Sequence, residues 1–146
     1  MRVRCLVWMR TFRKDKRLYT KDQRQMHNFR ELKVWQKAID FSVEIYKITS
    51  SFPVEEKFGL ISQLRRSAVS ISSNIAEGSS RTSDKEFFHF LSISIGSSYE
   101  SETQLIISNK LKYVSDINFE ELTKKVTEIQ KMLHAFAEII KNKYSK

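Results

Sequence analysis

The chain has 146 residues and a formal net charge of +9, with 26 lysines and arginines against 17 aspartates and glutamates. This length suits one domain with one hydrophobic core. Three glycines and one proline are too few for the turns of a many-stranded β protein, so the composition favours a few long helices. The single cysteine, Cys5, excludes an internal disulfide and a cluster of thiolate ligands.

Most of the positive charge lies at the N-terminus. Residues 1–26 hold nine basic and two acidic residues, whereas residues 27–146 hold 17 basic and 15 acidic residues. We therefore divide the chain into a basic leader, residues 1–27, and a nearly neutral helical domain, residues 28–146. The leader has neither an apolar period nor a signal-peptide cleavage pattern, so we expect it to be disordered. A basic arm that touches RNA or an acidic membrane surface is the alternative.

Residues 31–50 have the apolar spacing of a helix, and two adjacent apolar stripes cover about half of its circumference. One stripe contains Val34, Phe41, Ile45 and Ile48, and the other contains Trp35, Ile39 and Tyr46. A helix this apolar in a small domain is expected to bury two sides, one of them against a second subunit. We assign the Val34, Phe41, Ile45 and Ile48 stripe to that oligomer interface.

A second helix is predicted from Pro53 to about Glu77, because proline is tolerated in a first turn and Gly78 suits a left-handed C-cap. Opposite its apolar stripe is a row of mostly small polar side chains. Small hydroxyl residues let helices approach closely, so the row is a candidate oligomer interface, with a simple exposed face as the alternative. The row consists of Gln63, Arg66, Ser70, Ser73 and Glu77.

The third helix is expected to begin after Ser83, which forms a capping box with Glu86, and to end near Asn109. Asp116 or Asn118 can cap the last helix. The apolar residues of that helix recur three and four positions apart from Phe119 onwards, which is the spacing of left-handed bundle packing. Four helices with short connections predict an all-α, antiparallel up-down four-helix bundle.

Glu102 falls within the apolar arc of the third helix, and a buried carboxylate needs a partner. We predict an ion pair between Glu102 and Arg65, with Arg66 as second choice. Arg65, Arg66, Arg81 and Lys85 lie around the second helix and the connection that follows it, so they are candidate contacts for RNA phosphates. A locally neutralised loop is the alternative.

No enzyme or cofactor is predicted. Glu86 and His89 form one Glu-x-x-His half-motif, but a di-iron bundle needs a second copy and two further glutamates. We therefore expect no metal and no catalytic residue. The missing disulfides fit a cytoplasmic protein, and no apolar run reaches the roughly 20 residues that span a bilayer.

Five short motifs stand out in the helical domain: Phe29-Arg30-Glu31-Leu32-Lys33-Val34-Trp35, Phe52-Pro53, Gln63-Leu64-Arg65-Arg66, Asn74-Ile75-Ala76-Glu77-Gly78 and Gly96-Ser97. With these motifs the chain resembles the bacterial four-helix bundle proteins encoded in intervening sequences of 23S ribosomal RNA genes. The resemblance covers about residues 28–143 and implies a ring-like homopentamer; a related branch is the RNA-binding accessory protein of diversity-generating retroelements. One departure is Lys112, which precedes Tyr113 where the family commonly has glycine.

Two functions follow as hypotheses. The first is a non-enzymatic homo-oligomer that binds structured RNA or an RNA-processing protein through its basic residues. The second is a purely structural or protein-binding assembly, in which the arginines form ion pairs within and between subunits.

Overall fold

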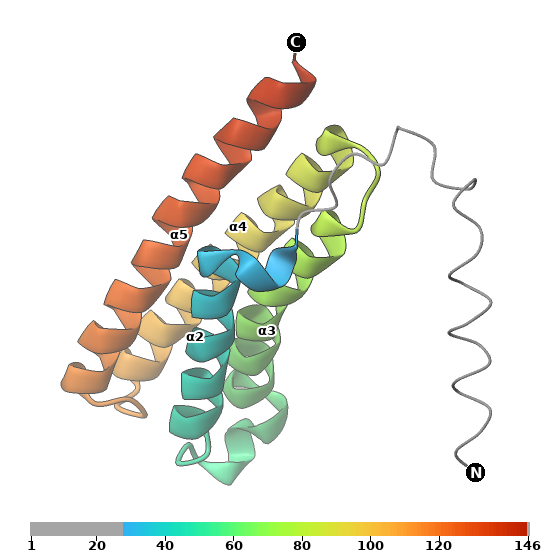
Figure 1. Cartoon of the computed structure of the whole chain (residues 1–146). Coiled ribbons are helices and arrows are strands. Elements are labelled where there is room, and N and C mark those ends of the chain that lie inside the picture. Colours follow the sequence, from blue (N-terminus) through green and yellow to red (C-terminus); the bar gives the residue numbers. More distant parts are fainter. Residues whose placement is uncertain (1–27, 146) are drawn as a thin grey trace, which may run out of the picture.

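The computed structural model describes residues 28–145, so the predictions for the basic leader fall outside the described residues. Within the described part, four α-helices follow one another: α2 (Lys33–Thr49), α3 (Leu60–Ser79), α4 (Asp84–Lys110) and α5 (Asp116–Tyr144). Two short 3-10 helices, η1 (Phe29–Glu31) and η2 (Val54–Phe58), precede α2 and α3. The four helices run up and down in turn (Figure 1), which confirms the predicted all-α antiparallel bundle.

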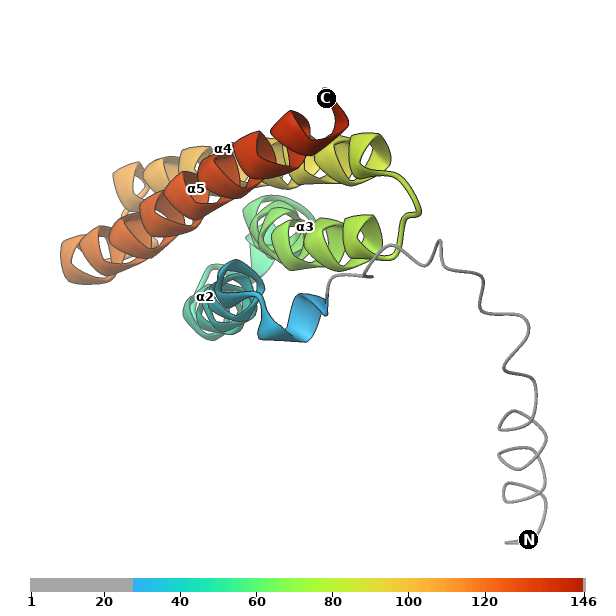
Figure 2. The ribbon, with the colours of Figure 1, turned by 45° about the horizontal axis from the view of Figure 1, so that its top comes forward.

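The helices form two layers, with α2 and α3 in one and α4 and α5 in the other (Figure 2). Each helix packs against the next along the chain, and α5 closes the bundle against α2. The closest packing joins α3 to α4, and α2 and α4 lie at opposite corners without contact. This arrangement leaves the outer faces of α2 and α4 on different sides of the molecule.

The core lies between the two layers. The predicted apolar stripe of α3 faces this core: Leu64, Ala68, Ile71 and Ile75 are at 0% exposure, and Leu60 at the start of the helix is partly buried. Val34, Phe41 and Ile45 of α2 are buried in the same core. Their assignment to an oligomer interface is therefore wrong, and Ile48 is also partly buried against the core. The two stripes of α2 are almost equally apolar, and packing against α3 and α5 selects the one that turns inward.

Two helix starts differ from the prediction. Chain direction changes at Gly59 (φ −98°, ψ −118°), so α3 begins at Leu60 and the residues after Pro53 form η2 instead. A carboxylate oxygen of Glu56 accepts a hydrogen bond from the Leu60 N–H at 2.9 Å. Ser115, rather than Asp116 or Asn118, caps α5. The predicted capping box at the start of α4 is confirmed. Ser83 Oγ accepts a hydrogen bond from the Glu86 N–H at 3.2 Å and donates to the Glu86 carboxylate at 2.8 Å.

The α4–α5 connection holds the single described residue other than glycine with a positive φ, Lys112 at 63°. The N–H groups of Lys112 and Tyr113 donate to the carbonyls of Asn109 and Ser108, both at 2.9 Å. This pair of bonds is a Schellman motif with Lys112 in the left-handed position where helices usually have glycine. Lys112, which stands where the resembled family commonly has glycine, thus adopts a backbone conformation that glycine reaches at lower cost.

We expect the substitution Lys112→Gly to stabilise the bundle by about 1 kcal/mol, because it relieves the cost of placing a Cβ in the left-handed region. The matched control is Lys110→Gly at the end of α4, which should destabilise by about 0.5–1 kcal/mol since it adds backbone freedom to a helix. Urea unfolding followed by circular dichroism measures both. Equal losses for the two variants would contradict this interpretation of Lys112.

Candidate interaction surfaces

Arg65 and Glu102 do not pair. The Arg65 side chain turns toward α2, where its Nε donates to Thr49 Oγ1 at 2.8 Å and its guanidinium lies 4.7 Å from the centre of the Tyr46 ring. Glu102 turns toward α5 and accepts a hydrogen bond from Gln130 Nε2 at 2.7 Å. The predicted ion pair is therefore wrong. Glu102 is only half-buried, so an amide donor and remaining solvent contact suffice for its charge.

An exposed apolar band crosses the α2–α3 face; we call Ile39, Val43, Tyr46 and Val69 the α2–α3 band. These side chains are between 36% and 49% exposed. The three α2 residues share one side of the helix, because they lie four and three positions apart. The contact of Tyr46 with Arg65 brings this side next to α3, on which Val69 lies one turn from Arg65. Of the second predicted stripe of α2, Ile39 and Tyr46 thus face outward, whereas Trp35 packs against the core.

Four further exposed apolar side chains are spread over the outer side of α4, with Tyr99 against His134 of α5; we call Ile93, Tyr99, Ile106 and Ile107 the α4 band. Their exposures lie between 39% and 48%. Between Ile93 and Tyr99 is Gly96, and a Cβ placed there would meet nothing within 4 Å. Because α4 also buries Phe87, Leu91 and Leu105, it is apolar on its inner and outer sides.

The predicted row on α3 lies between the two bands. Four of its members are exposed, as an interface with a second copy of the chain requires: Gln63, Arg66, Ser73 and Glu77. Ser70 is half-buried and its hydroxyl lies 2.9 Å from that of Ser97 on α4. One member of the row therefore serves the packing of α3 against α4, and Glu77 pairs with Arg81; Gln63, Arg66 and Ser73 remain available.

A buried hydroxyl network joins α3 and α4, and sequence reasoning did not find it. Ser101 Oγ donates to Ser67 Oγ, and Ser67 Oγ donates to Gln104 Oε1, both at 2.8 Å. Ser94 Oγ donates to the carbonyl of Ile71 at 2.8 Å. The available signal was the number of serines at inward positions of α4, where small side chains let two backbones come close.

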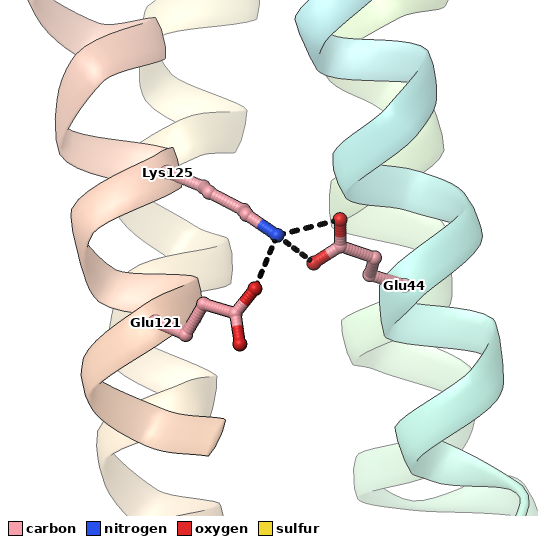
Figure 3. A network of polar contacts seen from close by, with 3 residues as sticks. All are labelled: Glu44, Glu121 and Lys125. Atoms are coloured by element: carbon pink, nitrogen blue, oxygen red, sulfur yellow. Dashed lines mark hydrogen bonds and ion pairs between the residues drawn. The ribbon is translucent and has the colours of Figure 1, made fainter. Parts of the chain in front are cut away.

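Charged side chains bridge the seam between α2 and α5. Lys125 of α5 donates to both carboxylate oxygens of Glu44 on α2 and to Glu121 one turn away, all at 2.7 Å (Figure 3). Lys37 also reaches Glu128 across the seam, with 3.1 Å between the charged atoms. The hydrogen bond from Lys125, and then its charge, lower the pKa of Glu121, while the bonds to Glu121 and Glu44 raise the pKa of Lys125.

We expect Lys125→Met to destabilise the bundle by no more than about 1 kcal/mol, because the Lys125–Glu44 pair is partly exposed to solvent. The contribution of Glu121 to stability is complete above its ordinary pKa of 4.5 and is lost as the pH falls through its lowered pKa. The contribution of Lys125 to stability is complete below its ordinary pKa of 10.5 and is lost as the pH rises through its raised pKa.

The stability difference between the native chain and Lys125→Met should therefore be constant between these limits and shrink outside them. Urea unfolding at a series of pH values measures it. The control is Lys131→Met on the same helix, since Lys131 forms no ion pair with any described residue. A difference independent of pH would contradict the assignment.

The four candidate phosphate contacts do not form one cluster. Arg65 and Arg66 lie near the start of α3, and Arg81 and Lys85 lie beyond its end. The helix between them spans about 20 Å at a rise of about 1.5 Å per residue. Arg81 pairs with Glu77 and lies 4.7 Å from the centre of the Phe90 ring. Arg66 and Lys85 form no ion pair with the described residues.

The described residues offer neither a metal site nor a membrane-spanning helix. Over residues 28–145, no three His, Cys, Asp or Glu side chains gather closely enough to hold a metal ion. Glu86 of the half-motif is engaged by Ser83. None of the described helices combines the length and the apolar character needed to cross a membrane.

Comparison with known proteins gives the family. The family model described as "23S rRNA-intervening sequence protein" matches residues 30–135. A solved structure of a protein of unknown function from the S23 ribosomal protein family of Bacteroides thetaiotaomicron is similar, with 28% sequence identity and a TM-score of 0.65. The match covers 71% of this chain and 97% of that one. No curated protein matches. With its four-helix fold and a family match over most of its length, this chain belongs to the 23S rRNA-intervening sequence protein family.

Proposed function

We propose that this protein is a non-enzymatic, ring-forming homo-oligomer of the cytoplasm, in which the α2–α3 band of one copy packs on the α4 band of the next. The observation that supports it is the presence of two separate apolar bands on a bundle that already has a buried core. Exposed apolar surface of this kind marks sites of protein association.

A ring needs two different faces. In a dimer with two-fold symmetry one face meets itself, whereas a ring of an odd number of copies joins one face to a different one. The two bands satisfy this requirement, because they lie on α2 with α3 and on α4, and α2 and α4 occupy opposite corners. The homopentamer implied by the family resemblance is such a ring.

A second copy is the occupant that we favour for both bands. Residues 27–146 hold 17 basic and 15 acidic residues, so copies of the helical domain are not kept apart by net charge. The α3 row between the bands exposes both Arg66 and Glu77, which can complement charges of either sign at the edge of the contact. Apolar side chains on both faces then supply the main driving force.

Two aspartate substitutions test this proposal. Val43→Asp places a charge in the α2–α3 band, and Ile117→Asp places the same charge at the start of α5, outside both bands. Because Val43 and Ile117 are 49% and 79% exposed, neither change should unfold a subunit. We expect Val43→Asp alone to lower the mass in solution, measured by light scattering. Equal masses for both variants would reject the α2–α3 band as an interface.

RNA contact is a second candidate function, and the observation that favours it is the distribution of charge. The leader joins the described part at Asn28, at the end of the bundle where α2 begins and α3 ends, and its sequence supplies nine basic residues. Arg81 and Lys85 lie at that same end. We therefore place RNA contact there rather than at Arg65, which is engaged by α2.

Binding to a fragment of ribosomal RNA at several salt concentrations tests this second function. Phosphate contacts release counterions, so the affinity should fall steeply as the salt concentration rises. The purely structural alternative predicts no such binding, with the arginines held in ion pairs such as that of Arg81 with Glu77.

A further inference from the structure

A pocket with aromatic walls lies at the end of the bundle where α4 begins and α5 ends. It has a volume of about 470 Å³, and its lining comes from the first three turns of α4 and from the last residue of α5. The Phe88 and Tyr144 rings meet edge to face at 5.8 Å between centres, and the His89 and Phe90 rings at 5.9 Å. The residues that line it are Lys85, Glu86, Phe88, His89, Phe90, Ser92 and Tyr144.

The polar groups of the pocket are unequally engaged. The Glu86 carboxylate accepts from Ser83, and the Ser92 hydroxyl donates to the carbonyl of Phe88. The Lys85 side chain, in contrast, forms no hydrogen bond or ion pair with the described residues and is exposed. A ligand in this pocket would therefore meet aromatic rings, the Glu86 carboxylate held by Ser83, and the unpaired cation of Lys85.

One further unpaired cation lies beside the pocket. Lys143 is next to Tyr144 on α5 and has no ion pair among the described residues, whereas Lys141 pairs with Glu138 at 3.7 Å. Arg81, which pairs with Glu77, lies 4.7 Å from the centre of the Phe90 ring. Aromatic side chains within a basic surface are the arrangement that binds single-stranded nucleic acid, because bases stack on the rings while cations contact the phosphates.

We propose that this pocket receives an unpaired base of RNA, stacked against Tyr144 and His89, with Lys85 and Lys143 at the flanking phosphates. The proposal rests on the RNA contact inferred above and adds to it a preference for unpaired strands. In a duplex the bases are stacked inside the helix and their faces cannot reach these rings, so only the phosphate contacts would remain.

Fluorescence anisotropy tests this proposal with two probes: a fluorescein-labelled single-stranded RNA, and the same strand annealed to its complement. The full chain should bind the single strand more tightly. In the double variant His89→Ala/Tyr144→Ala, affinity for the single strand should fall roughly tenfold, because the stacking contacts are lost. Affinity for the duplex should change less than about twofold, because phosphate contacts depend little on the rings.

Two control variants separate stacking from other effects. Tyr144→Phe keeps the ring and should bind as the native chain does. Phe58→Ala removes an aromatic ring that is 88% exposed on η2, at the other end of the bundle and outside both bands, and should also leave RNA affinity unchanged. Circular dichroism of every variant shows whether the bundle remains folded; Tyr144 is the last residue of α5 and is 38% exposed, so we expect it to do so.

The outcomes distinguish the two inferences. If the double variant binds the single strand as tightly as the native chain, the base pocket is rejected while RNA contact through phosphates stands. If the native chain binds neither probe even at low salt, both the RNA contact and the pocket are rejected. Equal affinity of the native chain for the single strand and the duplex would also reject the pocket.

Discussion

Replacing Gly78 with alanine should destabilise the bundle by about 2–3 kcal/mol, because a Cβ at this position has no room. It would lie 2.7 Å from Cδ2 of Phe87 and 2.7 Å from Cβ of Phe90, both on α4. Phe87 is 2% exposed and packs in the core, so it cannot move aside without disturbing its neighbours. Either α3 and α4 separate at this end, or Phe87 leaves its place.

The matched control is Gly96→Ala, also within a helix. A Cβ at Gly96 meets nothing within 4 Å, so alanine should stabilise α4 by about 0.5–1 kcal/mol through its lower backbone entropy. Urea unfolding at one protein concentration measures both variants. Because Gly96 lies between Ile93 and Tyr99 of the α4 band, the mass of the Gly96→Ala variant in solution is measured as well, to show whether assembly changes. A loss of stability in both variants, with masses unchanged, would contradict the close approach at Gly78.

Replacing Ser101 with leucine should destabilise the bundle by about 3 kcal/mol, because it overfills the contact between α3 and α4. Ser101 is 0% exposed and its hydroxyl donates to Ser67, which in turn donates to Gln104. The larger side chain would push the two helices apart and would also break this chain of hydrogen bonds. Ser101→Ala should cost only about 1 kcal/mol, the contribution of one hydrogen bond.

The exposed Ser92 on the same helix provides the comparison for Ser101. Ser92→Leu should change the free energy of unfolding by less than about 0.5 kcal/mol, because an exposed position neither confines the side chain nor buries a donor. Thermal and urea unfolding measure the three variants. Equal effects of leucine at the two serines would show that the hydroxyl network does not set the distance between α3 and α4.

The bundle could be predicted from sequence because each helix carries a long apolar period. The core stripe of α3 and the capping box at Ser83 depend only on neighbours along the chain, and both are confirmed. The inward stripe of α2 was predicted wrongly, since two stripes of similar apolarity compete and the packing partners decide. Gly78 was predicted to be a left-handed cap, whereas it lies within α3, and no described glycine has a positive φ.

The side-chain pairs were harder to predict than the helices. Arg65 and Glu102 are both charged and both flank the core, but they turn toward different helices, which sequence spacing does not show. The bridge from Lys125 to Glu44 joins residues 81 positions apart, so no local pattern indicates it. Exposed bands likewise require the fold, because a residue such as Val43 counts as exposed only once its neighbours are placed.

The mass of the native full-length chain in solution is the most direct test of the central claim, which is assembly through two unlike apolar bands. Light scattering after size exclusion, at several protein concentrations, measures it. We expect a discrete assembly of more than two copies of the 17.3 kDa chain, five in the family's implied ring. A chain that remains monomeric at all concentrations would contradict the account, and so would a dimer, because two copies can use one band alone.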